Sequence, residues 1–256
     1  MSITRIQKPR FSPRKLAWLD VIAIAAWGFL MLKYWLAGQL VLLIHPSYIP
    51  LVVVAAICLL IVAFLKGKQL LKSRINTTSS VQHLAVFPPG WASSLLIFVA
   101  LLGFLITPKV FSSQTAGNRS ISELLGPTRA QPQSFKSSVR PEDRTLVEWV
   151  RTVNVYPEPD TYKGQKAKVK GFVVHSPDMA KEYLVLSQFV ITCCAADAYP
   201  IGLPVKLTES RDKYPPDSWL EIEGQMTTED FDGKRHLTIV ANSIKPIPQP
   251  KNPYSF

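Results

Sequence analysis

Three long apolar stretches occupy the first part of the chain, and polar or basic segments separate them. They cover about residues 16–36, 49–65 and 91–106. A helix that spans a membrane needs about 20 apolar residues, with a working range of about 17–25. The first stretch is long enough, whereas the other two need flanking residues. We therefore predict a membrane region over residues 1–107 with three transmembrane helices.

Positive charge is concentrated in the same half of the chain. Residues 1–144 carry 16 Lys or Arg and 4 Asp or Glu, whereas residues 145–256 carry 13 and 14. Basic residues precede the first apolar stretch and follow the second, and the turn between these stretches, residues 38–49, has no Lys or Arg. Because loops rich in Lys and Arg stay in the cytoplasm, we predict an integral plasma-membrane protein with a cytoplasmic N-terminus. Three crossings then place the C-terminal domain outside the cytoplasm.

The charge distribution also bears on partners. A reader of nucleic acid needs a basic surface, and the near-neutral C-terminal half lacks that excess, so we expect no nucleic acid partner. The basic N-terminal half fits contact with anionic membrane lipid.

Asp20 and Lys33 lie near the ends of the first predicted helix, where we expect them to reach toward the headgroups. A functional charge inside the membrane is the alternative.

A polar segment separates the membrane region from the rest of the chain. Residues 108–140 are rich in Ser, Gln, Gly and Pro, a composition that buries too little apolar surface to fold alone. We predict a linker there, with one short helical turn at Ile121–Leu125. A short helix should follow, because Pro141 and the acids after it are helix-opening signals. Leu146 and Trp149 then share one apolar face.

From Lys166 onward the hydrophobic pattern changes to a period of two, which is typical of β-strands. Glycines near the middle of the first and fourth segments permit tight bends. We therefore predict a membrane-anchored α + β protein, with an OB-like five-stranded β-barrel in a domain over residues 141–256. An SH3-like barrel and an open sandwich are the alternatives. The five predicted strands are Lys166–Val174, Tyr183–Thr192, Leu203–Thr208, Trp219–Thr227 and His236–Ala241.

Two of the three cysteines, Cys193 and Cys194, are adjacent, and Asp197 follows within a run of alanines. Neighbouring residues of a strand point to opposite faces, so both sulfurs reach one ion only if the backbone turns there. Three interpretations remain open: inert buried thiols, a vicinal disulfide or redox pair, and a site for a soft transition-metal ion. Asp197 and His175 are the further candidate ligands of such an ion.

No known catalytic motif accompanies these residues. The sequence has no Cys-x-x-Cys, no phosphate-binding loop and no glycine-rich dinucleotide motif. A single histidine at a strand end, such as His175, is more often exposed than a ligand. We therefore expect a protein without enzymatic activity and without catalytic residues.

Three segments of the C-terminal half carry a family resemblance: Gly171-Phe172-Val173, the Cys-Cys-x-Ala-Asp-Ala run within Phe189–Ala198, and Ile201–Val205. With them, the chain resembles an uncharacterised bacterial family of two-component membrane permease subunits. The order of apolar helices, polar linker and β-rich domain also matches. The resemblance implies a multi-spanning permease as partner, without a settled substrate, and it singles out Cys193, Cys194 and Asp197.

These observations lead to one expected function and two alternatives. We expect an auxiliary permease subunit whose extracytoplasmic barrel presents a Cys-Cys site to a soft ion or thiophilic solute. The first alternative is a membrane-anchored thiol-redox protein. The second is an anchored OB-type module that binds oligosaccharide or peptide, which requires that exposed aromatic residues such as Tyr183, Trp219 and Phe231 cluster on one face of the barrel.

Overall fold

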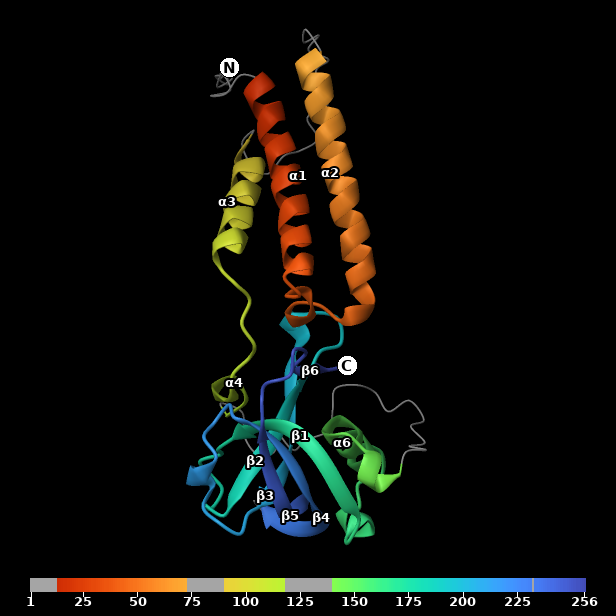
Figure 1. Ribbon diagram of the computed structural model, residues 1–256, viewed down its shortest axis with the longest axis vertical. Helices are drawn as coiled ribbons and strands as arrows, with labels where there is room; N and C mark the ends of the chain where they lie inside the picture. Colours follow the sequence, from red (N-terminus) through yellow and green to blue (C-terminus); the bar gives the residue numbers. More distant parts are fainter. Residues whose placement is uncertain (1–12, 73–89, 118–139, 232) are drawn as a thin grey trace, which may run out of the picture. The chain divides into compact units, whose positions relative to one another are not determined.

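A computed structural model describes residues 13–72, 90–117, 140–231 and 233–256 of the chain (Figure 1). The chain divides into two compact units, Met1–Pro108 and Lys109–Phe256. The first unit is helical, and the second is built around a six-stranded sheet. The protein is therefore a mixed α + β protein.

The first unit contains the helices α1 (Pro13–Leu36), α2 (Ile49–Lys72) and α3 (Trp91–Leu105). α1 lies beside both α2 and α3 (Figure 1). By length and composition, Arg14–Leu36 and Pro46–Lys72 are apolar enough to cross a membrane, whereas α3 has only 15 residues. All three predicted apolar helices are present in the described part of the chain.

α2 continues well past the end of its apolar run. The predicted helix ended near residue 65, but the helix extends to Lys72, so Lys66 and Lys68 lie on its last turns and not in a loop. Lysine is a good helix former, and its long stem allows the ammonium group to extend away from the apolar face. Pro50 lies in the first turn of α2, where a missing N–H costs nothing.

α1 and α2 approach closely through small residues. A Cβ atom on Gly28 would lie 2.9 Å from the Leu60 side chain and 3.2 Å from the Ala56 carbonyl oxygen. Ala56 is fully buried. Small residues allow helix backbones to pack closely where the surroundings are apolar, so Gly28 sets the separation of this helix pair.

α3 runs in the same direction as α1. Four side chains of α1 bond to α3, from near the start of both helices to near the end of both. Asp20 accepts from Ser93 Oγ, Trp27 Nε1 donates to Leu96 O (3.1 Å), Lys33 Nζ to Phe104 O (2.7 Å), and the Tyr34 hydroxyl to Gly103 O (2.5 Å). The two charged side chains that we expected to reach toward headgroups thus contact α3.

The sheet of the second unit has the order β1-β4-β5-β3-β2-β6, and β1 also pairs with β2. The pairs β3–β5 and β2–β6 are parallel, and the others are antiparallel. The strands are β1 (Lys166–Val174), β2 (Tyr183–Val190), β3 (Tyr199–Lys206), β4 (Trp219–Phe231), β5 (Lys234–Ile247) and β6 (Tyr254–Ser255).

Five of these strands correspond to the predicted ones; β1 has the predicted ends, and the other four have different ends. β3 begins four residues earlier than predicted, and it contains Pro200 and Pro204. β3 pairs with β5 only at Val205 and Lys206, and proline is tolerated along an unpaired strand edge. The two-residue β6 was not predicted.

Helix α6 (Leu146–Val155) covers the sheet and begins later than the proline signal suggested. Thr145 caps it through a capping box with Glu148, while Pro141–Asp143 form a separate 3-10 turn, η3. Leu146 and Trp149 are buried in the core, as the predicted apolar face requires.

From Lys109 onward, the predicted linker belongs to the second unit. The Phe111 ring lies 5.2 Å from the ring of Phe189, and the backbone N–H of Ser113 donates to the Asp217 carboxylate. Ser113–Gly117 form a short helix, α4. The helical turn predicted at Ile121–Leu125 lies outside the described residues.

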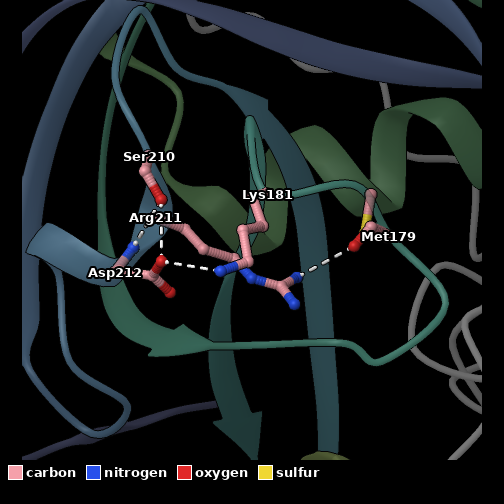
Figure 2. Close-up of polar contacts among 5 residues, drawn as sticks. All are labelled: Met179, Lys181, Ser210, Arg211 and Asp212. Carbon is pink, nitrogen blue, oxygen red and sulfur yellow. Dashed lines mark hydrogen bonds and ion pairs between the residues drawn. The ribbon is translucent and has the colours of Figure 1, made fainter.

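Arg211 stabilises the loop between β1 and β2 (Figure 2). Its Nη1 donates to the carbonyl oxygens of Ser176 (2.8 Å) and Met179 (3.2 Å), and its backbone N–H donates to Lys181 O (2.8 Å). The Lys181 ammonium in turn donates to the Asp212 carboxylate (3.2 Å). One arginine therefore links the β1–β2 loop to the turn that follows β3.

Candidate thiol site between strands β2 and β3

The adjacent cysteines lie in the short connection between β2 and β3. β2 ends at Val190, and the buried Ile191 still donates its backbone N–H to Ser255 O (3.0 Å). The chain then leaves the strand and forms a single 3-10 turn, η5 (Ala195–Asp197). Small alanine side chains allow this tight turn. The backbone change that both sulfurs need in order to reach one ion is present here.

The Asp197 carboxylate organises the connection. It accepts hydrogen bonds from the backbone N–H groups of Thr192 (3.3 Å), Cys193 (2.8 Å) and Cys194 (3.3 Å). The backbone N–H of Asp197 bonds in return to the Cys194 side chain, which completes a capping box. These reciprocal bonds satisfy backbone donors that a turn would otherwise leave unpaired, and they hold the carboxylate beside the sulfurs.

The two sulfurs lie close to each other and to this carboxylate. Cys193 Sγ is 3.6 Å from Cys194 Sγ, and both thiols are free. One ligand atom from each of Cys193, Cys194 and Asp197 falls within 4.8 Å of the others. Cys193 is exposed, and Cys194 and Asp197 are half-buried. The structure therefore brings three of the four candidate ligands together on an accessible turn.

The same contacts determine the protonation states. The hydrogen bond to the Asp197 carboxylate, followed by the one to Cys194, raises the pKa of Cys193 from its ordinary value of 9.0 to about 11. Burial acts to raise the pKa of Asp197, but the hydrogen bonds that it accepts, first from Cys193, bring it below its usual range. At neutral pH the site thus holds an ionised carboxylate beside protonated Cys193.

His175, the fourth candidate, lies outside this group. Its Nε2 is 2.8 Å from the carbonyl oxygen of Tyr214, and it is not among the residues whose ligand atoms gather at the cysteines. This contact links the same two loops that Arg211 joins. His175 therefore helps to hold these two loops together.

The three aromatic residues considered for a ligand-binding face do not form one cluster. The ring centroids of Tyr183 and Phe231 lie 5.2 Å apart. Trp219 is buried, and its ring centroid lies 6.0 Å from that of Phe172. Lys206 joins the Tyr183–Phe231 pair, because its ammonium lies 5.6 Å from the centroid of the Tyr183 ring and 2.8 Å from a Glu229 carboxylate oxygen.

A groove of about 720 Å³ lies beside η3, α6 and β1, and the sequence did not predict it. Its charged residues are mostly paired already. Lys168 and Lys170 bond to Glu221, and Glu148 caps α6. Arg144 is the exception, because its Nε and Nη1 have no hydrogen-bond partner among the described residues and its guanidinium lies over the Trp149 ring. One such group is not a convergent set of charges for a particular ligand, and the thiol site remains the candidate.

Comparison with known families covers both units. Residues 19–122 match the DUF1980 N-terminal domain, and residues 128–256 match the DUF1980 C-terminal domain. No curated protein matches the chain. The two matches follow each other in order and cover the apolar helices and the sheet, so the chain belongs to the DUF1980 family.

Proposed function

We propose that this protein is an auxiliary, non-enzymatic subunit of a membrane permease, whose C-terminal domain presents Cys193 and Cys194 to a soft ion outside the cytoplasm. The observation that carries the proposal is the convergence of two thiols and the Asp197 carboxylate on one exposed turn. Sulfur ligands select soft metal ions such as zinc and copper(I). Family membership extends over both units.

The first unit supports a membrane anchor with three crossings. α3 is short for a span, but its bonds to α1 extend from Ser93 to Phe104, parallel to the stretch from Asp20 to Tyr34. An α3 that crosses with α1, in the same direction, gives an odd number of spans, and the C-terminal domain then lies opposite the cytoplasmic N-terminus. Large apolar side chains such as Phe64 are exposed on the helices, which favours contact with lipid or with a second membrane protein.

The strand pairing favours an OB-type barrel for the C-terminal domain. β1 pairs with both β4 and β2, so the first strand connects the two sides of the sheet, as closure of a five-stranded barrel requires. In this arrangement the β2–β3 connection lies at one end of the barrel. A small rigid barrel with its thiol turn exposed is suited to present an ion to a neighbouring protein.

The raised pKa of Cys193 weighs against the thiol-redox alternative. Redox-active cysteines work as thiolates and have a lowered pKa, whereas the Asp197 carboxylate favours the protonated thiol here. An ion that binds both sulfurs releases their protons, so the same arrangement remains compatible with metal binding.

Purification of the tagged full chain from its own membrane in mild detergent tests the proposed role. We expect a multi-spanning membrane protein to co-purify at a fixed ratio, both with the wild type and with a Cys193→Ser/Cys194→Ser variant, since docking depends on the helices. A reporter fused after Phe256 should be active only outside the cytoplasm. Recovery of the chain without any multi-spanning partner, or a reporter that is active only in the cytosol, would contradict the proposal.

A further inference from the structure

The separation of the two sulfurs restricts the ion that they can share. A tetrahedral ion with metal–sulfur bonds of about 2.3 Å holds two sulfurs about 3.8 Å apart, whereas a linear two-coordinate ion with such bonds holds them about 4.6 Å apart. The observed Sγ–Sγ distance of 3.6 Å is close to the tetrahedral value. The two free thiols are therefore already separated by nearly the distance that a tetrahedral ion requires.

The Asp197 carboxylate supplies a third ligand that is already held in position. Its Oδ1 accepts from two backbone N–H groups, whereas its Oδ2 accepts only that of Cys193 at 2.8 Å. Oδ2 therefore accepts fewer bonds from the backbone than Oδ1, and one carboxylate oxygen of Asp197 lies within 4.8 Å of both sulfurs. An ion that replaces the thiol proton would bind between this oxygen and the sulfurs.

The charge of the site distinguishes between zinc and copper(I), the two soft ions that thiolates commonly bind. Two thiolates and one carboxylate carry three negative charges, so a divalent ion leaves one uncompensated charge and a monovalent ion leaves two. Like charges held together on one turn repel each other, which disfavours a monovalent ion. Among ions that thiolates select, zinc is divalent and tetrahedral.

We propose that the Cys193–Cys194–Asp197 turn is an open Zn²⁺ transfer site, bound by Cys193 Sγ, Cys194 Sγ and Asp197 Oδ2, with a fourth position for a ligand from another protein. Structural zinc sites are closed by four protein ligands, whereas three ligands and an open position leave the ion accessible. Because Cys193 is exposed, the fourth position faces outward. Each thiol releases its proton to solvent on binding, and no electron is transferred.

This inference rests on the proposed function only for the presence of an ion site, and it names the ion and its geometry. Zn²⁺ would leave by ligand exchange, as a ligand of the receiving protein takes the open position and the two sulfurs then dissociate in turn. A site made by three residues of one short turn suits such stepwise release, because no distant part of the domain must move.

Cobalt(II) is the probe for the coordination geometry. The full chain, purified in detergent under reducing conditions without oxygen, is titrated with Co²⁺, and Zn²⁺ is then added. We expect one Co²⁺ per chain, with intense visible bands of tetrahedral cobalt and sulfur-to-cobalt charge-transfer absorption, both lost as stoichiometric Zn²⁺ displaces the probe. Cys193→Ser and Cys194→Ser should each lose the charge-transfer absorption, whereas Cys58→Ser, the matched control in α2, should retain it.

X-ray absorption of the zinc-loaded wild type gives a measurement that needs no variant. We expect two sulfur neighbours at about 2.3 Å and lighter neighbours at about 2.0–2.2 Å. Fewer than two sulfurs, or a cobalt spectrum that depends on Cys58, would overturn the inference. Binding of Cu⁺ with no displacement of cobalt by Zn²⁺ would also overturn it, while the proposed soft-ion site would stand. Zinc bound in this geometry by a chain that has no permease partner would retain the inference and contradict the subunit role.

Discussion

Oδ2 of Asp197 lies 2.8 Å from the backbone nitrogen of Cys193, so one carboxylate fixes the backbone of the turn and also faces the thiol of the same cysteine. The bond to the backbone stabilises the ionised carboxylate, and the ionised carboxylate in turn favours the protonated thiol. The thiol chemistry of this turn therefore depends on the charge of Asp197.

The reactivity of Cys193 should reveal this dependence. With a pKa of about 11 in place of 9.0, the thiolate fraction of Cys193 at pH 8 is lower by on the order of 100-fold. Asp197→Asn removes the negative charge, so we expect faster alkylation of Cys193 at pH 8 and a pH profile displaced downward toward 9. Mass spectrometry of the alkylated peptide assigns the adduct to Cys193 or Cys194. Asp178→Asn, at an exposed carboxylate on the β1–β2 loop, should leave the rate unchanged; a wild-type profile centred at 9 or below would contradict the assignment.

Acid should weaken the second unit through the same residue. The pKa of Asp197 is lower in the folded protein than its ordinary value, so the unfolded state binds the proton more readily. Its contribution to stability is therefore present above the unfolded pKa and is lost as pH falls through the folded pKa. Between pH 5 and pH 2 we expect the free energy of unfolding to fall more steeply for the wild type than for Asp197→Asn, as measured by urea unfolding followed by tryptophan fluorescence. Equal slopes would show that Asp197 contributes nothing to the acid dependence.

The sequence predicts those parts of this site whose contacts join residues that are close in the chain, and it does not predict contacts between distant residues. Asp197 lies beside the cysteines because a turn of only a few residues separates them, so their proximity follows from their close spacing in the sequence. The role of Asp197 as an acceptor for three backbone N–H groups was not predicted, although Cys194 and Asp197 have the spacing of a capping box. His175 bonds to Tyr214, 39 residues away, and local spacing carries no information on such a contact.

The same reasoning applies to the fold. β1 has the predicted bounds because alternation and the central glycine are local features. β6 exists only because Tyr254 and Ser255 pair with Phe189 and Val190, so two residues with no pattern of their own become a strand. Phe111 was assigned to the linker by the polar composition around it, and only its contact with Phe189 places it in the second unit.

The contact of Phe111 should contribute to the stability of the second unit. Its ring packs against the rings of Phe189 and Tyr254 but remains half-buried, so Phe111→Ala should destabilise the unit by about 1–3 kcal/mol, less than the ~3–5 kcal/mol of a fully buried phenylalanine. Urea unfolding of the full chain in detergent measures the change. Tyr156→Ala, at an aromatic residue that is 58% exposed, is the control and should change stability by less than half as much. If the two variants are equally stable, residues 109–117 act only as a linker.

The cap of α6 offers a second, smaller test of local structure. Thr145 accepts from the Glu148 backbone and the Glu148 carboxylate accepts from Thr145 N (2.7 Å), so Thr145→Ala removes the cap at a cost of about 1 kcal/mol. Hydrogen exchange should then increase at the first turn of α6 and remain unchanged in β4. Thr208→Ala, at an exposed threonine, should have no such effect; unchanged exchange at the first turn of α6 in Thr145→Ala would contradict the capping role.

Two glycines in the helical unit allow the same substitution to be compared in opposite surroundings. Alanine is more favourable than glycine in a helix interior by about 1 kcal/mol, so the substitution stabilises where space is available. A Cβ atom on Gly67 meets only Val21, at 3.9 Å, whereas one on Gly28 lies 2.9 Å from Leu60 and 3.2 Å from the Ala56 carbonyl oxygen. We expect Gly67→Ala to raise the unfolding temperature in detergent and Gly28→Ala to lower it, because overpacking costs about 1–3 kcal/mol. If Gly28→Ala is as stable as Gly67→Ala, α1 and α2 do not pack through Gly28.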